Sequence, residues 1–186
     1  MSALIRQQMR IKILRRSRSL ALVLPLWLLG NGGDPGVLLE LDRAAYRVVA
    51  RDLKGGASGP ALRVAVGSPA HPTPTGNFPL RQVVHNPGWS PDSAAPRAGG
   101  GVELPSGEGP LGVAEIPFLG AYALHGGLRP PLLGKPNTLG CLRSADPQLA
   151  ELLAWLEQRG ALATEESLSS GEWRQPFVRP TRLVIY

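Results

Sequence analysis

The sequence predicts a mainly β domain with one or two helices. Short segments of β-branched and aromatic residues recur along the chain with turn residues between them, which is typical of strands. Glycine and proline supply 23 and 19 of the 186 residues and disfavour long helices. The clearest helical pattern covers residues 146–159. A chain of this length fits one domain of ordinary size that buries its core without disulfide bonds.

The first 36 residues are predicted to be an export segment and linker, separate from the domain at 37–186. Basic residues precede an apolar run at residues 20–29. That order is typical of a secretory signal, and the run is shorter than the roughly 20 residues that span a bilayer. We therefore expect an exported protein of the periplasm or cell wall. Two alternatives stay open: an uncleaved anchor at residues 19–29, and a basic amphipathic helix that contacts a membrane.

The charge of the chain argues against nucleic-acid binding. The formal net charge is +6, but six of the 20 basic residues lie before residue 19, and no acidic residue precedes Asp34. The other 14 basic residues balance the 14 acidic ones, so the predicted domain is formally neutral. DNA or RNA binding needs a basic face on the folded domain. We expect no nucleic-acid partner.

The strands follow from alternating apolar positions and from the turns between them. The predicted strands are residues 37–42, 45–51, 61–67, 78–84 and 181–186. A turn at residues 54–56 favours an antiparallel sheet at the start of the domain. Residues 68–117 are rich in proline and glycine, and within them residues 91–108 are either a binding loop or flap, or a disordered insertion.

The helix has signals at both ends. Asp146 suits the N-cap, Pro147 suits the first helical position, and Gly160 suits the residue after the end. The apolar positions of the segment fall on one face, with Trp155 near the edge. They are Leu149, Leu152, Leu153 and Leu156. This face is predicted to cover a sheet.

Cys141 is the only cysteine of the chain, and His125 precedes it by sixteen residues. A cysteine attacks as thiolate, and an imidazole that accepts the thiol proton makes thiolate available near neutral pH. His125 follows an apolar segment, residues 122–124, that is typical of a strand end. The two residues are predicted to form a catalytic dyad. Burial of Cys141 as a small hydrophobic residue is the competing interpretation.

The neighbours of these residues suggest further roles. Gly140 permits a backbone shape in which the N–H groups of Gly140 and Cys141 converge on a developing oxyanion. The Gly126 carbonyl can accept from one ring nitrogen of His125 and so aim the other at sulfur, with Asp146 as the alternative orienting group. Arg143 can lower the pKa of the thiol or hold a substrate carboxylate, and a surface salt bridge is its structural alternative.

Residues 125–143 resemble the signature of the L,D-transpeptidase catalytic domain family, also called YkuD: His-Gly, a loop, then Ser/Thr-x-Gly-Cys-hydrophobic-Arg. Three earlier segments are similar to motifs of that family in the same order. They are Thr73-Pro74-Thr75-Gly76-Asn77-Phe78, Asn86-Pro87-Gly88-Trp89 and Gly109-Pro110-Leu111-Gly112. The chain departs from the family pattern at Leu139, where a histidine is common, and at Gly109, which replaces asparagine.

The resemblance implies a mixed β-sandwich that acts on peptidoglycan stem peptides. Cys141 would attack the bond between the diamino acid and the terminal D-Ala of a tetrapeptide stem and form an acyl-enzyme. His125 would serve as base and then acid, and a neighbouring stem would accept the acyl group as a 3→3 crosslink. The residues expected to contact substrate are Trp89, Asn137, Thr138 and Arg143.

The resemblance leaves several alternatives open. Water as acceptor would make the protein an L,D-carboxypeptidase, and a protein lysine would make it an anchoring enzyme. A catalytically silent peptidoglycan-binding module is a further alternative, motivated by Leu139. No metal or cofactor is expected, since His71, His85 and the dyad lack the spacing of a zinc site. His71 and His85 are interpreted as loop residues, and the protein is expected to be a monomer.

Overall fold

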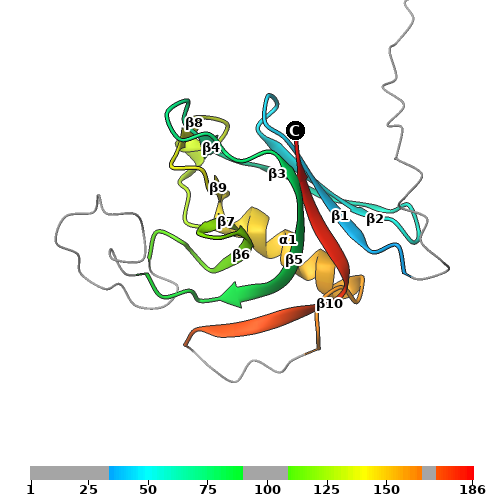
Figure 1. Ribbon diagram of the computed structural model, residues 1–186. Coiled ribbons are helices and arrows are strands. Elements are labelled where there is room, and N and C mark those ends of the chain that lie inside the picture. Colours follow the sequence, from blue (N-terminus) through cyan, green and yellow to red (C-terminus); the bar gives the residue numbers. More distant parts are fainter. Residues whose placement is uncertain (1–33, 90–108, 165–170) are drawn as a thin grey trace, which may run out of the picture.

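The computed structural model describes residues 34–89, 109–164 and 171–186 (Figure 1). Within these ranges the chain forms a mainly β domain with one α-helix, as predicted. The predicted export signal lies almost wholly in residues 1–33, outside the described residues, as does the predicted loop at 91–108. In the described part of the chain, no helix is long and apolar enough to cross a membrane.

Eight strands form one mixed sheet, in the order β3-β2-β1-β10-β5-β6-β7-β9, and β4 pairs with β8 separately. The strands are β1 (Val37–Asp42), β2 (Arg47–Asp52), β3 (Ser58–Arg63), β4 (Val66–Gly67), β5 (Gly76–His85), β6 (Ala114–Leu119), β7 (Tyr122–His125), β8 (Pro136–Thr138), β9 (Leu142–Arg143) and β10 (Trp173–Ile185). In the large sheet β1 and β10 run parallel, as do β7 and β9, and the other pairs are antiparallel. This is the mixed β architecture that was expected.

Several strand limits differ from the prediction. The segment predicted at 45–51 begins only at Arg47, because Tyr46 adopts a left-handed φ of 53° in the preceding turn. The segment predicted at 61–67 is divided between β3 and β4. β10 begins well before the predicted residue 181 and pairs with β5 across an irregular register between Pro176 and Thr181. β6 was not predicted, because proline and glycine interrupt the pattern around it.

The large sheet is strongly curled, so that its two ends approach each other (Figure 1). Ala65, just after β3, exchanges two backbone hydrogen bonds with Arg143 of β9, at 2.8 and 3.0 Å. This contact joins the segment after the first edge strand to the last edge strand. The curl encloses most of the apolar core and brings β4, β8 and β9 together at one end of the domain.

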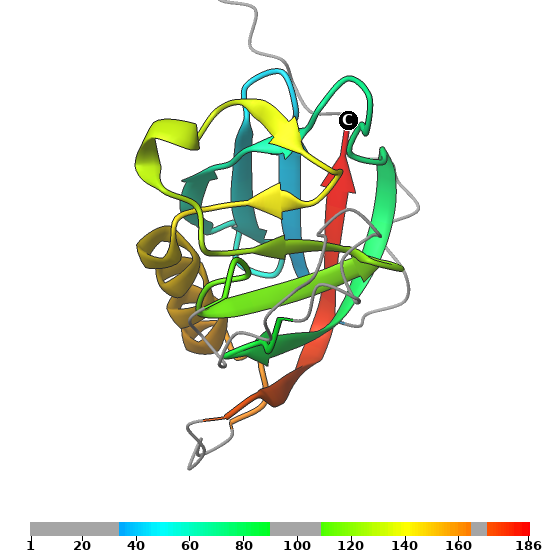
Figure 2. The same ribbon diagram turned by 90° about the vertical axis from the view of Figure 1, so that its left-hand side faces the viewer.

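The helix α1 (Asp146–Gln158) lies on one side of the sheet (Figure 2). Its four predicted apolar residues are buried and belong to the core. The predicted N-cap role of Asp146 is wrong: Ala145 occupies the N-cap without a side-chain hydrogen bond, and Asp146 is the first helical residue. Its carboxylate instead contacts backbone groups of two distant loops, described below.

The residues just before β1 are held against β10 by an ion network. Arg179 Nη2 donates to Asp34 Oδ1 and to Asp52 Oδ1, each at 2.9 Å. These hydrogen bonds from Arg179 lower the pKa of Asp34 to about 2 and also lower that of Asp52. Asp34, predicted to lie in the linker, is therefore fixed to the folded domain.

Candidate active site

The pairing of β7 with β9 brings the two ends of the predicted motif together. The two strands run parallel, with Leu124 opposite Leu142 and His125 opposite Arg143. Side chains alternate along a strand, so the buried Leu124 and Leu142 share one face, and His125 and Arg143 share the other. Cys141 directly precedes β9 and lies two residues before Arg143.

His125 is buried and held in one orientation. Its ring nitrogen Nδ1 lies 3.0 Å from the Gly126 carbonyl oxygen. Because a carbonyl only accepts, Nδ1 carries the proton in the neutral ring, and Nε2 keeps a free lone pair. The pKa of His125 is lowered to about 4, chiefly by burial and then by the Arg143 charge, while the Gly126 hydrogen bond and the Asp146 charge act in the opposite direction. At pH 7 His125 is therefore a neutral base.

The Cys141 thiol is hydrogen-bonded to a backbone carbonyl in this conformation. Its Sγ donates to the carbonyl of Ala121 at 3.7 Å, and no hydrogen bond within the described ranges joins it to the His125 ring. Burial raises the pKa of the thiol, while a backbone N–H of Ala123 and the charge of Arg143 act in the opposite direction. The site thus holds a neutral thiol beside a neutral imidazole, and proton transfer requires the sulfur to turn toward Nε2.

The loop that carries Cys141 is braced by Thr138. The hydroxyl of Thr138 donates to the Cys141 carbonyl at 2.6 Å and accepts from the Gly140 N–H at 3.1 Å. Gly140 has a φ of 117°, and a Cβ there would overlap the Tyr122 ring. Position 140 therefore requires glycine, both for its backbone conformation and for the space beside Tyr122. The Thr138 hydroxyl and the Gly140 N–H, predicted to face substrate, bind each other in this conformation.

Arg143 joins two loops beside His125. Its Nη2 donates to the carbonyls of Pro110 and Gly127, at 3.2 and 3.3 Å, while its Nε is buried without a partner. In this conformation Arg143 stabilises the loops around the dyad. Its predicted contact with a substrate carboxylate stays a prediction.

Asp146 holds the same two loops through their N–H groups. Its Oδ1 accepts from Gly127 N at 2.9 Å and from Val113 N at 3.1 Å. A Cβ on Gly126 or on Gly112 would overlap that oxygen, so both positions need glycine for the carboxylate to approach. The orienting partner that His125 contacts directly is the Gly126 carbonyl, as predicted, and Asp146 acts on the peptide behind it.

The other predicted substrate contacts lie near this loop or at the limit of the described chain. Asn137 is exposed in β8, and Leu139 is 52 % exposed directly before the Gly140-Cys141 pair. Trp89 is half-buried and is the last described residue before residue 90. Among the described residues, no hydrogen bond connects these side chains to His125 or Cys141, so their roles stay predictions.

The sequence interpretation missed Glu115. This residue of β6 lies directly opposite His125 in the antiparallel pair β6–β7. Burial raises the pKa of Glu115, the nearby Glu172 adds to this, and Arg174 opposes it. An acidic residue inside the apolar segment 114–119 was the available signal, but only strand pairing puts it beside the dyad.

His85 is part of the fold, and the described residues hold no metal cluster. His85 is the last residue of β5. Its ring stacks on the Trp173 ring with 4.0 Å between the centroids, and its Nε2 lies 2.9 Å from Gln175 Oε1. His85 is therefore a strand residue and not the predicted loop residue. Within the described ranges no group of three or more His, Cys, Asp or Glu side chains could hold a metal ion.

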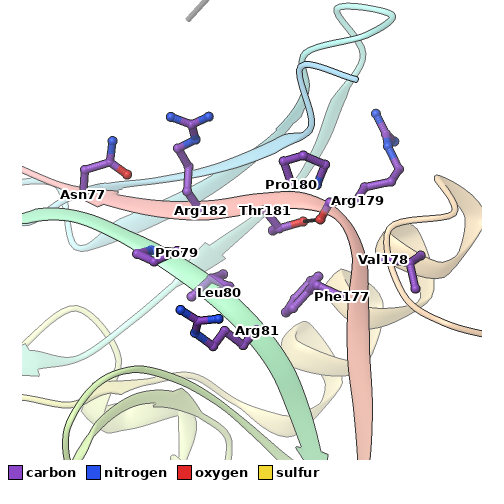
Figure 3. Close-up of a pocket in the computed structure, with 10 residues that line it drawn as sticks. All are labelled: Asn77, Pro79, Leu80, Arg81, Phe177, Val178, Arg179, Pro180, Thr181 and Arg182. Atoms are coloured by element: carbon purple, nitrogen blue, oxygen red, sulfur yellow. Dashed lines mark hydrogen bonds between the residues drawn. The ribbon is translucent and has the colours of Figure 1, made fainter. Parts of the chain in front are cut away.

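A hollow of about 530 Å³ lies elsewhere, at the irregular register between β5 and β10 (Figure 3). Its lining includes Leu80 and Arg81 of β5 and Phe177 and Arg182 of β10. Its lining contains none of the residues around Cys141. The hollow is therefore separate from the predicted dyad.

Comparisons with known proteins show the family and the fold. The family model of the L,D-transpeptidase catalytic domain, YkuD, matches residues 37–175. L,D-transpeptidase 3 from Mycobacterium tuberculosis is 12 % identical, with 81 % of this chain and 61 % of that chain covered and a TM-score of 0.55. Another L,D-transpeptidase from M. tuberculosis H37Rv is also 12 % identical, with 81 % and 57 % covered and a TM-score of 0.51.

A third solved structure, an L,D-transpeptidase in complex with imipenem, is 10 % identical with a TM-score of 0.51, and 81 % of this chain and 59 % of that chain are covered. At these identities the likeness concerns the fold. The chain spans about three fifths of the length of these solved structures. No curated protein matches the sequence.

Proposed function

Because the chain belongs to the L,D-transpeptidase catalytic domain family (YkuD), we propose that it is an exported cysteine L,D-transpeptidase acting on peptidoglycan tetrapeptide stems. One observation carries the proposal. A neutral His125, fixed through Nδ1 by the Gly126 carbonyl, ends the strand β7 that pairs in parallel with β9, and the only cysteine of the chain directly precedes β9. In this proposal residues 37–186 are the catalytic domain, and residues 1–36 direct export or anchor the protein.

Acylation begins when the Cys141 sulfur turns from Ala121 toward His125. Nε2 takes the thiol proton as sulfur attacks the carbonyl carbon of the bond between the diamino acid and D-Ala. The C–N bond then breaks, and the protonated His125 gives its proton to the leaving amine of D-Ala. A thioester on Cys141 remains, and no redox step or metal is needed for this balance.

Deacylation repeats these proton transfers in reverse. The amine of a neighbouring stem attacks the thioester, His125 accepts the amine proton, and the Cys141 thiol is restored as the new amide forms. The product is a 3→3 crosslink. Water in place of the amine would give the L,D-carboxypeptidase reaction, and a protein lysine would give protein anchoring.

The oxyanion and substrate contacts belong to the same proposal. The Cys141 N–H is the first donor to the oxyanion, and the Gly140 N–H becomes the second once it leaves Thr138. Arg143, Asn137 and Trp89 line the approach to the dyad in this proposal. The protein acts as a monomer in the periplasm or cell wall.

Two features favour a second candidate, a silent peptidoglycan-binding module. The thiol contacts Ala121 instead of His125, and the Gly140 N–H is occupied by Thr138. A resting site with loose catalytic contacts is also common in active enzymes, because these contacts tighten when substrate binds. The two candidates differ in whether Cys141 forms a covalent adduct.

The test incubates the full chain with purified tetrapeptide-stem muropeptides and follows products and intact protein by mass spectrometry. We expect release of D-Ala, crosslinked dimers, and a transient adduct on Cys141 that lacks D-Ala. Cys141→Ala should abolish all three. Full turnover by Cys141→Ala would disprove the mechanism.

The same experiment separates the alternatives. Stem peptides that lose D-Ala without dimers indicate water as the acceptor. A wild-type protein that binds stems but forms no adduct, either with them or with a carbapenem near neutral pH, indicates the silent module.

A further inference from the structure

The most informative contact outside the dyad is the one between Asp146 and the turn after His125. Asp146 lies 21 residues along the chain from His125 and on a different element, the first turn of α1. Its Oδ1 accepts from the N–H of Gly127 at 2.9 Å. That N–H belongs to the peptide unit whose carbonyl is Gly126, the direct acceptor of His125 Nδ1–H at 3.0 Å.

One peptide unit thus connects the carboxylate to the imidazole. A negative charge at its N–H end pushes electron density toward the carbonyl oxygen, which becomes a better hydrogen-bond acceptor. Hydrogen bonds in series strengthen one another in this way by roughly 10–30 % each. Hydrogen bonds thus connect Asp146 through the Gly126–Gly127 peptide to His125 Nδ1. The other ring nitrogen, Nε2, is the one proposed to take the thiol proton.

We propose that Asp146 is a positioning residue for His125, acting through the Gly126–Gly127 peptide. The inference rests on the proposed function, since it concerns the base of that reaction. Asp146 fixes the plane of the peptide, which keeps the Nδ1–H hydrogen bond in line and Nε2 directed at sulfur. Its charge also stabilises the imidazolium that forms when His125 takes the thiol proton.

The charges around His125 give Asp146 a specific task. Arg143 of β9 is positive and opposes protonation of the ring, while Glu115 of β6 lies opposite His125 in the strand pairing. Cys141 directly precedes β9. The Asp146 charge favours the protonated ring and so offsets part of the Arg143 charge during catalysis.

The local structure is built to admit this carboxylate. Gly112 and Gly126 leave no Cβ where Oδ1 lies, and Val113 supplies a second N–H to the same oxygen at 3.1 Å. Arg143 holds the next carbonyl, that of Gly127, at 3.3 Å. Gly127 is therefore held at its N–H by Asp146 and at its C=O by Arg143, and these two contacts restrict rotation of the Gly126–Gly127 peptide.

The test uses three variants of the full chain. Asp146→Asn keeps an oxygen acceptor for both N–H groups but removes the charge. Asp146→Ala removes both. Glu151→Ala removes an exposed acidic side chain from the same helix and serves as the matched control.

Three measurements report on His125. The ¹⁵N NMR shifts of the His125 ring give its tautomer, and the pH dependence of these shifts gives the pKa of the ring. Steady-state kinetics on muropeptides give kcat and KM. The first two need no peptidoglycan substrate, so they decide the Asp146 proposal even where turnover on muropeptides is absent and the proposed function fails.

We expect Asp146→Ala to lower kcat by roughly 10- to 100-fold, by analogy with the loss found when the outer hydrogen-bond partner of a metal-binding histidine is removed, with little change in KM. Its His125 ring should populate both tautomers. Asp146→Asn should keep the Nδ1–H tautomer and recover most of kcat, but the His125 pKa should move lower. Glu151→Ala should match the wild type in all three.

The proposal is overturned if both Asp146 variants match Glu151→Ala in tautomer, pH dependence and kcat. If Asp146→Ala does not fold, Asp146→Asn decides alone. An unchanged His125 pKa in that variant would show that the carboxylate merely holds the loops.

Discussion

The buried, neutral His125 makes stability depend on pH in a defined window. In the unfolded chain its pKa is near the ordinary value of 6.5, and in the folded protein burial, followed by the Arg143 charge, lowers it to about 4. Between these values the unfolded state binds a proton that the folded state does not. Stability contributed by the neutral ring is therefore complete above about pH 6.5 and is lost as the pH falls toward 4.

The size of this loss follows from the two pKa values. Each pH unit between them is worth about 1.4 kcal/mol, so the change from 6.5 to about 4 corresponds to about 3 kcal/mol. The ring is only 5 % exposed, so solvent screening reduces this little. The loss is a large fraction of the 5–15 kcal/mol stability typical of folded proteins.

The perturbation is His125→Asn, whose side-chain amide can still donate to the Gly126 carbonyl but does not titrate. Urea unfolding of wild type and variant at several pH values from 7.5 to 4 gives two stability curves. All other titrating groups are common to both proteins, so the difference between the curves isolates His125. We expect wild type to lose about 3 kcal/mol relative to the variant across this range. A difference that stays constant with pH would refute a buried neutral imidazole.

Three further outcomes are expected. Gly126→Ala should abolish muropeptide turnover and lower the free energy of unfolding by about 1–3 kcal/mol, because its Cβ overlaps the carboxylate behind the turn, whereas Gly55→Ala, in open space, should change neither. Arg179→Met should lower the free energy of unfolding by about 2 kcal/mol in urea titrations, because the largely buried Asp52 carboxylate loses its partner, and an unchanged midpoint would contradict this. Iodoacetamide should modify Cys141 more slowly at pH 7 than a small free thiol and faster as the pH rises, because burial raises the pKa of the thiol; rapid, pH-independent modification would indicate a preformed thiolate.

Patterns local in the chain predicted much of the fold. The leucines of α1 were recognised from their spacing, because a helix repeats every 3.6 residues whatever it packs against. The strand at Val37–Asp42 was recognised from its run of apolar residues after a linker of glycine and proline. The predicted ends of strands were wrong where a contact distant in sequence determines them. In β10, for example, the first half is held by pairing with β5.

Asp146 shows how tertiary contacts override a local preference. An aspartate before Pro147 is a good N-cap by propensity, because its side chain can accept from the first free N–H groups of the helix. In the folded protein the same oxygen accepts from Val113 and Gly127, which lie 33 and 19 residues away in sequence. No local pattern indicates that approach.

The sequence by itself determined the chemical groups: one thiol, one histidine at the matching spacing, and glycines where the backbone has to be bare. These follow from residue type, and residue type decides which atoms can attack, accept or donate. Only the tertiary structure decided their states. Burial keeps His125 and Cys141 neutral, strand pairing puts Glu115 opposite the base, and the Thr138 hydroxyl occupies the Gly140 N–H. Such states depend on what surrounds each group in space, and that environment comes from parts of the chain far apart in sequence.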